Sequence, residues 1–193
     1  MRRLQIILLL SFLNICIYAQ EADFYKRLSA AAIELTKDKV TYDPRYYSIP
    51  YPNGDVPSDK GVCTDVIVRA YRKLGIDLQQ KIHVDMRANF SKYPKKWGLK
   101  GTDKNIDHRR VPNQAMYFSR FGTVLKVSDK GSDYSPGDIV TWDLGGGITH
   151  IGIVTDRMSS DGERPLIVHN IGRGQVLEDC LFSFKITGLY RYK

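Results

Sequence analysis

The sequence predicts an α+β domain with a mostly antiparallel sheet. Apolar residues recur at helical spacing through the first two thirds of the chain, whereas short β-branched runs separated by turns fill the last third. Helices that come first and strands that follow favour an antiparallel sheet, because a parallel sheet needs strands and helices in alternation. Apolar residues make up 42% of the 193 residues, which is enough to bury a core.

Four helices are expected before the strands begin. Phe24, Leu28 and Leu35 place an apolar side on the first helix. Gly75 is a natural stop for the second, and Pro112 opens the fourth. The expected helices span residues 23–37, 61–74, 78–89 and 111–121. Turn-forming residues fill the loop 41–61, and a basic loop precedes the fourth helix.

Five strands are expected after the helices. The expected strands span residues 123–127, 138–142, 150–155, 166–170 and 186–192. No repeat, low-complexity tract or linker divides the chain, so a single domain over residues 20–193 is expected.

Residues 1–19 have the pattern of an export signal. Arg2 and Arg3 precede an almost wholly apolar stretch, and Ala19 provides a small residue at the cleavage position. The apolar stretch is shorter than the ~20 residues that a membrane span needs. A retained anchor and lipid attachment at Cys16 are the alternatives. We therefore expect a mature protein without a membrane span, located outside the cell, in the periplasm or at the cell surface.

The charge balance first suggests a nucleic-acid partner, since the net charge is +8. Removal of Arg2 and Arg3 with the signal leaves 27 basic residues against 21 acidic ones, a net charge of +6. No helix dense in Arg and Lys is present, and export separates the protein from nucleic acid. We expect no nucleic-acid partner; the basic surface suits an anionic cell envelope instead.

Cys63 is the candidate nucleophile among three cysteines, a number that excludes a four-cysteine zinc site. It lies in the first turn of a predicted helix, where the dipole and free N–H groups favour a thiolate and an oxyanion. A small buried core cysteine is the equally weighted alternative. Cys180 lies among apolar residues and is expected to be buried. A disulfide between Cys63 and Cys180 would exclude the nucleophile.

A cysteine nucleophile needs a histidine base and a group that orients the base. His150 opens one predicted strand, and His169 and Asn170 end the next. Adjacent strands would bring His150 close to His169 or Asn170. His83, inside a helix, is expected to be structural. No zinc-binding motif is present, so we expect no metal and no other cofactor.

Four segments occur in an order that resembles the NlpC-type cell-wall peptidases, a branch of the papain-like cysteine hydrolases. They are Cys63-Thr64, Pro136–Val140, His150–Val154 and Val168-His169. The stretch Tyr51–Gly54 is similar to one that precedes the family's cysteine. The mature chain also resembles exported bacterial proteins grouped only as a domain of unknown function, which share GVCTDV, DHRRVPN, PGDIVTW, HIGIV and VHNIG. The sequence departs from the NlpC pattern around the cysteine, at Val62, Thr64 and Asp65, so the substrate contacts are expected to differ from those of that family.

The resemblance implies a papain-like fold, with the cysteine at a helix N-terminus packed on the sheet. It implies Cys63 as nucleophile, His150 as base and then acid, and His169 or Asn170 as the orienting residue. Other candidate site residues are Tyr51 near the oxyanion, Asp65 as a cap or amine ligand, and Arg109 and Arg110 as carboxylate ligands or a solvated pair.

The function that follows is amide hydrolysis in the peptide part of peptidoglycan through an acyl-enzyme. A wall-binding module that keeps the fold without catalysis is the alternative. The partner is peptidoglycan or a related peptide, and a monomer is expected. The sequence leaves open which amide bond is cleaved.

Overall fold

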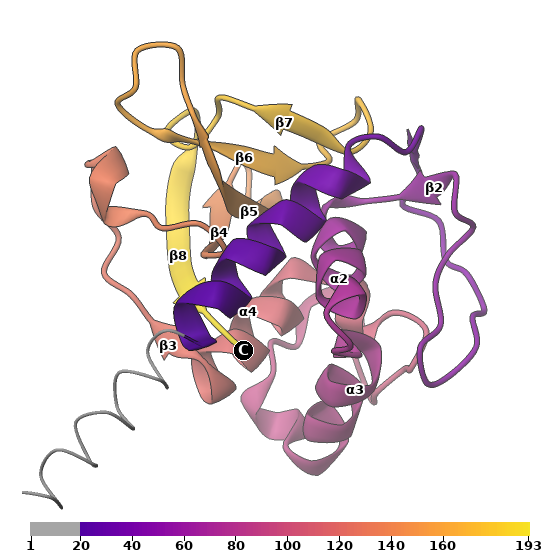
Figure 1. Cartoon of the computed structure of the whole chain (residues 1–193). Helices are drawn as coiled ribbons and strands as arrows, with labels where there is room; N and C mark the ends of the chain where they lie inside the picture. The colour runs from indigo at the N-terminus through magenta and orange to yellow at the C-terminus, as the bar shows by residue number, and fades with distance from the viewer. Residues whose placement is uncertain (1–19) are drawn as a thin grey trace, which may run out of the picture.

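The computed structural model describes residues 20–193, so the predicted export signal and Cys16 lie outside the described residues. All four predicted helices are confirmed. The helices are the N-terminal helix (20–35), α2 (Cys63–Lys73), α3 (Leu78–Ala88) and α4 (Val111–Phe121). Figure 1 shows the N-terminal helix running across the sheet beside α2. Within the described part of the chain, no helix has the length and apolar character that a membrane span requires.

The main sheet has six antiparallel strands in the order β3-β8-β4-β5-β6-β7. Their bounds are Thr123–Val124 for β3, Ile139–Asp143 for β4, Thr149–Met158 for β5, Pro165–His169 for β6, Val176–Glu178 for β7 and Lys185–Arg191 for β8. The five predicted strands are present with shifted ends. β7 was not predicted, because a three-residue strand is too short to show an alternating pattern.

A second sheet consists of two short parallel strands at the two ends of the loop that leads to α2. It joins β1 (Thr41–Tyr42) to β2 (Lys60–Gly61). Tyr42 is paired with Gly61, two residues before Cys63. The sequence pattern predicted only a loop over 41–61. The pair therefore places an unpredicted tyrosine beside the start of α2.

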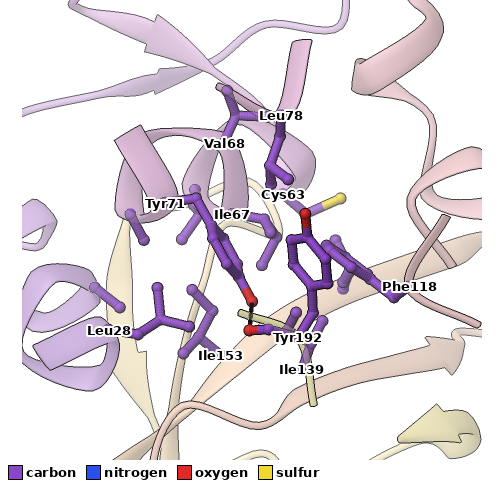
Figure 2. Packing of buried hydrophobic residues seen from close by; sticks show 14 of the residues in the cluster. Leu28, Cys63, Ile67, Val68, Tyr71, Leu78, Phe118, Ile139, Ile153 and Tyr192 are labelled. Atoms are coloured by element: carbon purple, nitrogen blue, oxygen red, sulfur yellow. Dashed lines mark hydrogen bonds between the residues drawn. The ribbon is translucent and has the colours of Figure 1, made fainter. Parts of the chain in front are cut away.

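Apolar side chains cover both faces of the sheet, because successive residues of a strand point to opposite sides. The cluster between helices and sheet, which we call the helix-side core, contains Leu28, Cys63, Ile67, Tyr71, Phe118, Ile139, Ile151 and Ile153 among its members. Figure 2 shows Cys63 in this core and the hydroxyl of Tyr71 donating to the carbonyl oxygen of Tyr192. The opposite face carries a second cluster, the outer core, which includes Val140, Trp142, Val154, Ile167, Cys180 and Leu189.

The loop before α2 is tied to the rest of the fold by polar side chains. Arg69 on α2 donates to the carboxylate of Asp55 and to the carbonyl oxygen of Lys60. Asn170, just after β6, donates to the carbonyl oxygen of Gly61 at 3.2 Å. These bonds fix the chain at both sides of the point where the helix begins. The position of Cys63 is thus set by contacts from the helix, the loop and the sheet.

Candidate active site

Cys63 is the first residue of α2, as the glycine-bearing loop before it predicts. The carboxylate of Asp65 accepts from the N–H of Val62 at 2.7 Å, so it caps the helix one turn in. Only 6% of Cys63 is exposed, and burial raises the pKa of its thiol to about 12. The N–H groups of Ile151, Thr64 and Cys63 favour the thiolate but are outweighed. Burial therefore favours the neutral thiol, in contrast to the thiolate expected from the helix N-terminus, because desolvation outweighs the neighbouring N–H groups.

His150 and His169 meet on neighbouring strands. The Nε2 atom of His150 lies 2.8 Å from the Nδ1 atom of His169, and both rings are buried. The His150 ring also lies against Trp142, with ring centres 5.8 Å apart. Burial, and next the neighbouring His169, lower the pKa of His150 to about 3. His150 is therefore a neutral imidazole at neutral pH, the form that a general base requires.

Glu178 extends this pair to a third group. Its Oε2 atom lies 2.9 Å from the Nε2 atom of His169. An ionised carboxylate only accepts hydrogen bonds, so His169 carries its proton on Nε2 and accepts at Nδ1. His150 must then donate from Nε2, which leaves a lone pair on its Nδ1. Glu178 was missed because it belongs to β7, the strand that the sequence pattern did not predict.

α2, which Cys63 opens, packs against β5, but no hydrogen bond joins Cys63 to His150 in the described structure. The backbone N–H of Ile151 lowers the pKa of the Cys63 thiol, and Thr149 lines the same pocket as Cys63. Ile151 belongs to the helix-side core with Cys63, whereas His150 packs on Trp142 of the outer core. Successive side chains of β5 point to opposite faces of the sheet, so His150 points away from the face on which its neighbours Thr149 and Ile151 lie. A Cys63–His150 proton transfer therefore needs the start of β5 to shift, and not only a change of side-chain rotamer.

Asn170, the alternative orienting residue, is engaged elsewhere. Its amide nitrogen donates to Gly61, and its amide oxygen accepts from the N–H of Gly172 at 3.2 Å. The group that His150 contacts is His169. Asn170 thus holds the loop ahead of the candidate nucleophile.

A small pocket of about 170 Å³ opens beside Cys63. Its lining residues are Tyr42, Pro44, Val62, Cys63, Thr64, Trp97, Ile106, Arg109, Arg110, Val111 and Thr149. Tyr51 is not among them: its ring packs edge-on against His83 at 5.3 Å, with the Lys104 ammonium 5.9 Å from the ring centre. The tyrosine beside the candidate nucleophile is Tyr42. The pKa of Tyr42 is raised by burial and then by the nearby Cys63 and Asp65.

Asp65 and Arg109 form a buried, two-pronged ion pair under the pocket. The Nε and Nη2 atoms of Arg109 lie 2.9 Å and 3.0 Å from the two carboxylate oxygens of Asp65. Their side chains are 2% and 3% exposed. Arg109 also donates to the carbonyl oxygens of Arg45 and Asp43. Of the two roles expected for Asp65, the structure supports the helix cap. Its carboxylate is occupied by Arg109 and is not open to a substrate amine. Arg109 is not half of a solvated pair.

The remaining candidates are structural or unpaired. Cys63 and Cys180 are both free, so no disulfide joins them. Cys180 is buried as expected, with its sulfur 3.6 Å from Nε2 of His169. His83 pairs with the buried carboxylate of Asp107 at 2.9 Å and is structural, as predicted. Over residues 20–193, no three His, Cys, Asp or Glu side chains are grouped so that they could hold a metal ion.

The fold and the site define an α+β protein with a cysteine at a helix N-terminus and a His–His–Glu chain on the adjoining sheet. The chain belongs to the family described as Domain of unknown function (DUF1287), whose pattern matches residues 29–192. It is also similar to "Uncharacterized protein YijF" of Escherichia coli (strain K12), with 52% identity over 151 residues, 78% of this chain and 73% of that protein. The match to the family includes every residue of the candidate site.

Proposed function

We propose that this chain is an exported cysteine hydrolase of NlpC-like, papain-like type that cleaves an amide bond in the peptide part of bacterial peptidoglycan. The observation that carries the proposal is the position of Cys63. It opens a helix, borders a pocket that Thr149 of β5 also lines, and shares a core with Ile151, next to the start of the His150–His169–Glu178 chain. The order of the four NlpC-like segments along the sequence agrees with this arrangement.

In the proposed reaction, substrate binding shifts the start of β5 so that the His150 ring, which packs on Trp142, comes within reach of the Cys63 thiol. Catalytic hydrogen bonds are often long in unliganded enzymes and tighten with substrate. The proton of the thiol moves to Nδ1 of His150, and the sulfur attacks the amide carbonyl carbon. The first N–H groups of α2 stabilise the oxyanion, since they have no partner within the helix. His150 then gives its proton to the departing amine as the C–N bond breaks, and water hydrolyses the thioester to release the acid and the thiol.

His169 and Glu178 act through His150 and are positioning residues. Glu178 holds the proton of His169 on Nε2, so that Nδ1 of His169 accepts from His150. This keeps the free lone pair of His150 on Nδ1. When His150 becomes an imidazolium, the chain ending in the Glu178 carboxylate stabilises its charge.

The proposed place of action is the cell envelope. The pattern of residues 1–19 predicts export, and a net charge of +6 on the mature chain suits an anionic polymer. The proposed protein acts as a monomer on peptidoglycan and requires no metal or other cofactor.

A wall-binding module without catalysis is the second candidate. The neutral, buried Cys63 thiol and the missing Cys63–His150 hydrogen bond favour it. Under this alternative the pocket beside Cys63 would still bind wall peptides. No fragments would be released.

Digestion of purified cell walls, with product masses as the readout, separates the two functions. The wild-type protein and the Arg87→Gln control, at an exposed position on α3, release peptide-bearing fragments under reducing conditions, whereas Cys63→Ala and His150→Ala release none. The masses identify the amide bond. Wall binding by the wild-type protein without any fragment release would overturn the hydrolase and establish the binding module.

A further inference from the structure

Arg110 differs from its neighbour Arg109 in having no partner for its charge. Arg109 is matched by the Asp65 carboxylate and two carbonyl oxygens. The guanidinium of Arg110 forms no hydrogen bond or ion pair with any residue in the range 20–193, and its Nη1 atom is shielded from solvent without a partner. Because buried donors in proteins are almost always satisfied, this group calls for an acceptor that the chain itself does not provide.

Thr64 supplies a second unsatisfied polar group in the same pocket. Its residue is 1% exposed, and its Oγ1 atom has no hydrogen-bond partner in the described part of the chain. Both Thr64 and Arg110 line the pocket beside Cys63. None of the residues that line the pocket is an acid, so a hydroxyl and a guanidinium that can both donate define a site for an anion.

Trp97 covers this site from the basic loop. The guanidinium carbon of Arg110 lies 4.8 Å from the centre of the Trp97 ring, a cation–π contact. Trp97 has a left-handed backbone (φ 60°) and remains 61% exposed. A large non-glycine residue is rarely held in this conformation without a local reason. Here the conformation places the indole over Arg110 at the edge of the pocket.

We propose that Arg110 and Thr64, under Trp97, form a subsite that binds a carboxylate of the substrate next to the amide carbonyl attacked by Cys63. The inference rests on the proposed function and specifies its substrate class. A planar carboxylate accepts two parallel bonds from a guanidinium. The volume of about 170 Å³ is below the ~300–1,000 Å³ of whole-ligand pockets, so the pocket holds one residue of a longer peptide.

This subsite selects peptides with a free carboxylate beside the scissile amide. Peptidoglycan stem peptides have such carboxylates, because they contain side-chain-linked acidic residues and free ends. An ordinary protein backbone has none beside an internal amide unless a side chain supplies it. The subsite would therefore separate wall peptides from folded proteins in the same compartment.

The test measures binding to Cys63→Ala protein by titration calorimetry, with a stem tetrapeptide and the same peptide with its carboxylates converted to carboxamides. The free-carboxylate peptide binds more tightly by about tenfold or more, the value of one charge-assisted bond pair. Adding Arg110→Gln removes this preference, and adding Thr64→Val reduces it. The matched control Arg87→Gln, which removes an exposed arginine on α3, leaves it unchanged.

Equal binding of the two peptides, binding of neither, or a preference that survives Arg110→Gln overturns the subsite. Hydrolysis by the wild-type protein is scored separately. Cleavage of both peptides at equal rates leaves the hydrolase standing and removes the subsite. Arg110-dependent binding without cleavage by the wild-type protein leaves the subsite standing and removes the hydrolase.

Discussion

The Nε2 atom of His150 faces the Nδ1 atom of His169 at 2.8 Å, and this bond sets which nitrogen of His150 is free. The two residues lie on adjacent antiparallel strands, so their spacing is fixed by the sheet and not by a flexible loop. The carboxylate of Glu178 determines the direction of the bond, since it fixes the proton of His169 on Nε2. Glu178, a partly exposed acid on an edge strand, thus determines through His169 which nitrogen of the buried His150 ring carries the proton.

Replacing Glu178 tests this control. In Glu178→Ala, His169 is free to move its proton to Nδ1, where it opposes the proton of His150. We expect kcat/KM on wall fragments to fall by about tenfold to a hundredfold, less than or equal to the lower limit of the ~10²–10⁴-fold range of general-base catalysis, because the base itself is retained. Nitrogen-15 NMR of the ring nitrogens reports the His169 tautomer directly, and a structural role alone would not change it.

The conservative Glu178→Gln variant keeps an acceptor oxygen and retains more activity than Glu178→Ala. Glu163→Gln, at an exposed acid in the turn between β5 and β6, is the matched control and behaves as wild type. An unchanged His169 tautomer and an unchanged rate in Glu178→Ala would show that the carboxylate has no role.

The buried Asp65–Arg109 ion pair is expected to contribute to the stability of the fold. Both side chains are almost fully buried, so removing one leaves an uncompensated charge in the interior. We expect Asp65→Ala to lower the free energy of unfolding by about 3–5 kcal/mol, as measured by denaturant titration. It also removes the cap on the N–H of Val62.

Arg109→Lys keeps the positive charge but loses the two-pronged geometry, so we expect it to lower the free energy of unfolding by less than Asp65→Ala does. It also provides a folded variant to measure if Asp65→Ala fails to fold. Asp23→Ala, which breaks an exposed pair with Arg27, is the control and costs under about 1 kcal/mol. Losses of similar size for Arg109→Lys and Asp23→Ala would refute the proposed importance of the buried pair.

The sequence was sufficient to predict the long helices and strands and the site residues that lie on them. The four helices and five strands follow from periodicity, and the start of α2 places Cys63 correctly. The meeting of His150 with His169 follows from two consecutive strands that pair. These features depend on local pattern and on near neighbours in sequence.

What the sequence left open depends on short elements and on burial. β1 and β7 are two and three residues long, yet they bring Tyr42 and Glu178 to the site. The raised pKa of the Cys63 thiol depends on how completely the fold excludes water, which the helix dipole does not reveal. The pairing of Asp65 with Arg109 joins residues 44 positions apart, so no local rule predicts it.

Tyr42, and not Tyr51, is expected to influence the chemistry at Cys63. Tyr42 lines the pocket, whereas Tyr51 packs on His83 outside it. Tyr42→Phe removes a hydroxyl from the pocket, and we expect kcat/KM to fall by about tenfold, less than the ~10²–10³-fold loss for a full oxyanion donor. Tyr51→Phe serves as the matched control with near wild-type rates. A larger loss in Tyr51→Phe than in Tyr42→Phe would reverse the assignment.

His150 and His108 are expected to stay neutral well below the usual range of histidine. Burial is the main reason that the pKa of each falls from 6.5 to about 3 in the folded protein. Above pH 6.5 both residues are neutral in the folded and the unfolded chain, and their contribution to stability is complete. Between pH 6.5 and 3 only the unfolded chain takes up these protons, so stability falls as the pH falls, by about 1.4 kcal/mol per pH unit for each histidine.

The measurement is a proton NMR titration of the imidazole Cε1–H resonances, with the urea-unfolded protein as the reference. The resonances of His150 and His108 stay fixed from pH 8 to pH 5 in the folded protein and titrate near pH 6.5 in urea. In the His108→Gln variant, unfolding takes up one proton fewer in this pH range, so the free energy of unfolding depends less steeply on pH. Because a neutral His150 is the required base, hydrolysis should also persist to pH 5. A midpoint near pH 6 for His150 in the folded protein would contradict its burial as a neutral base.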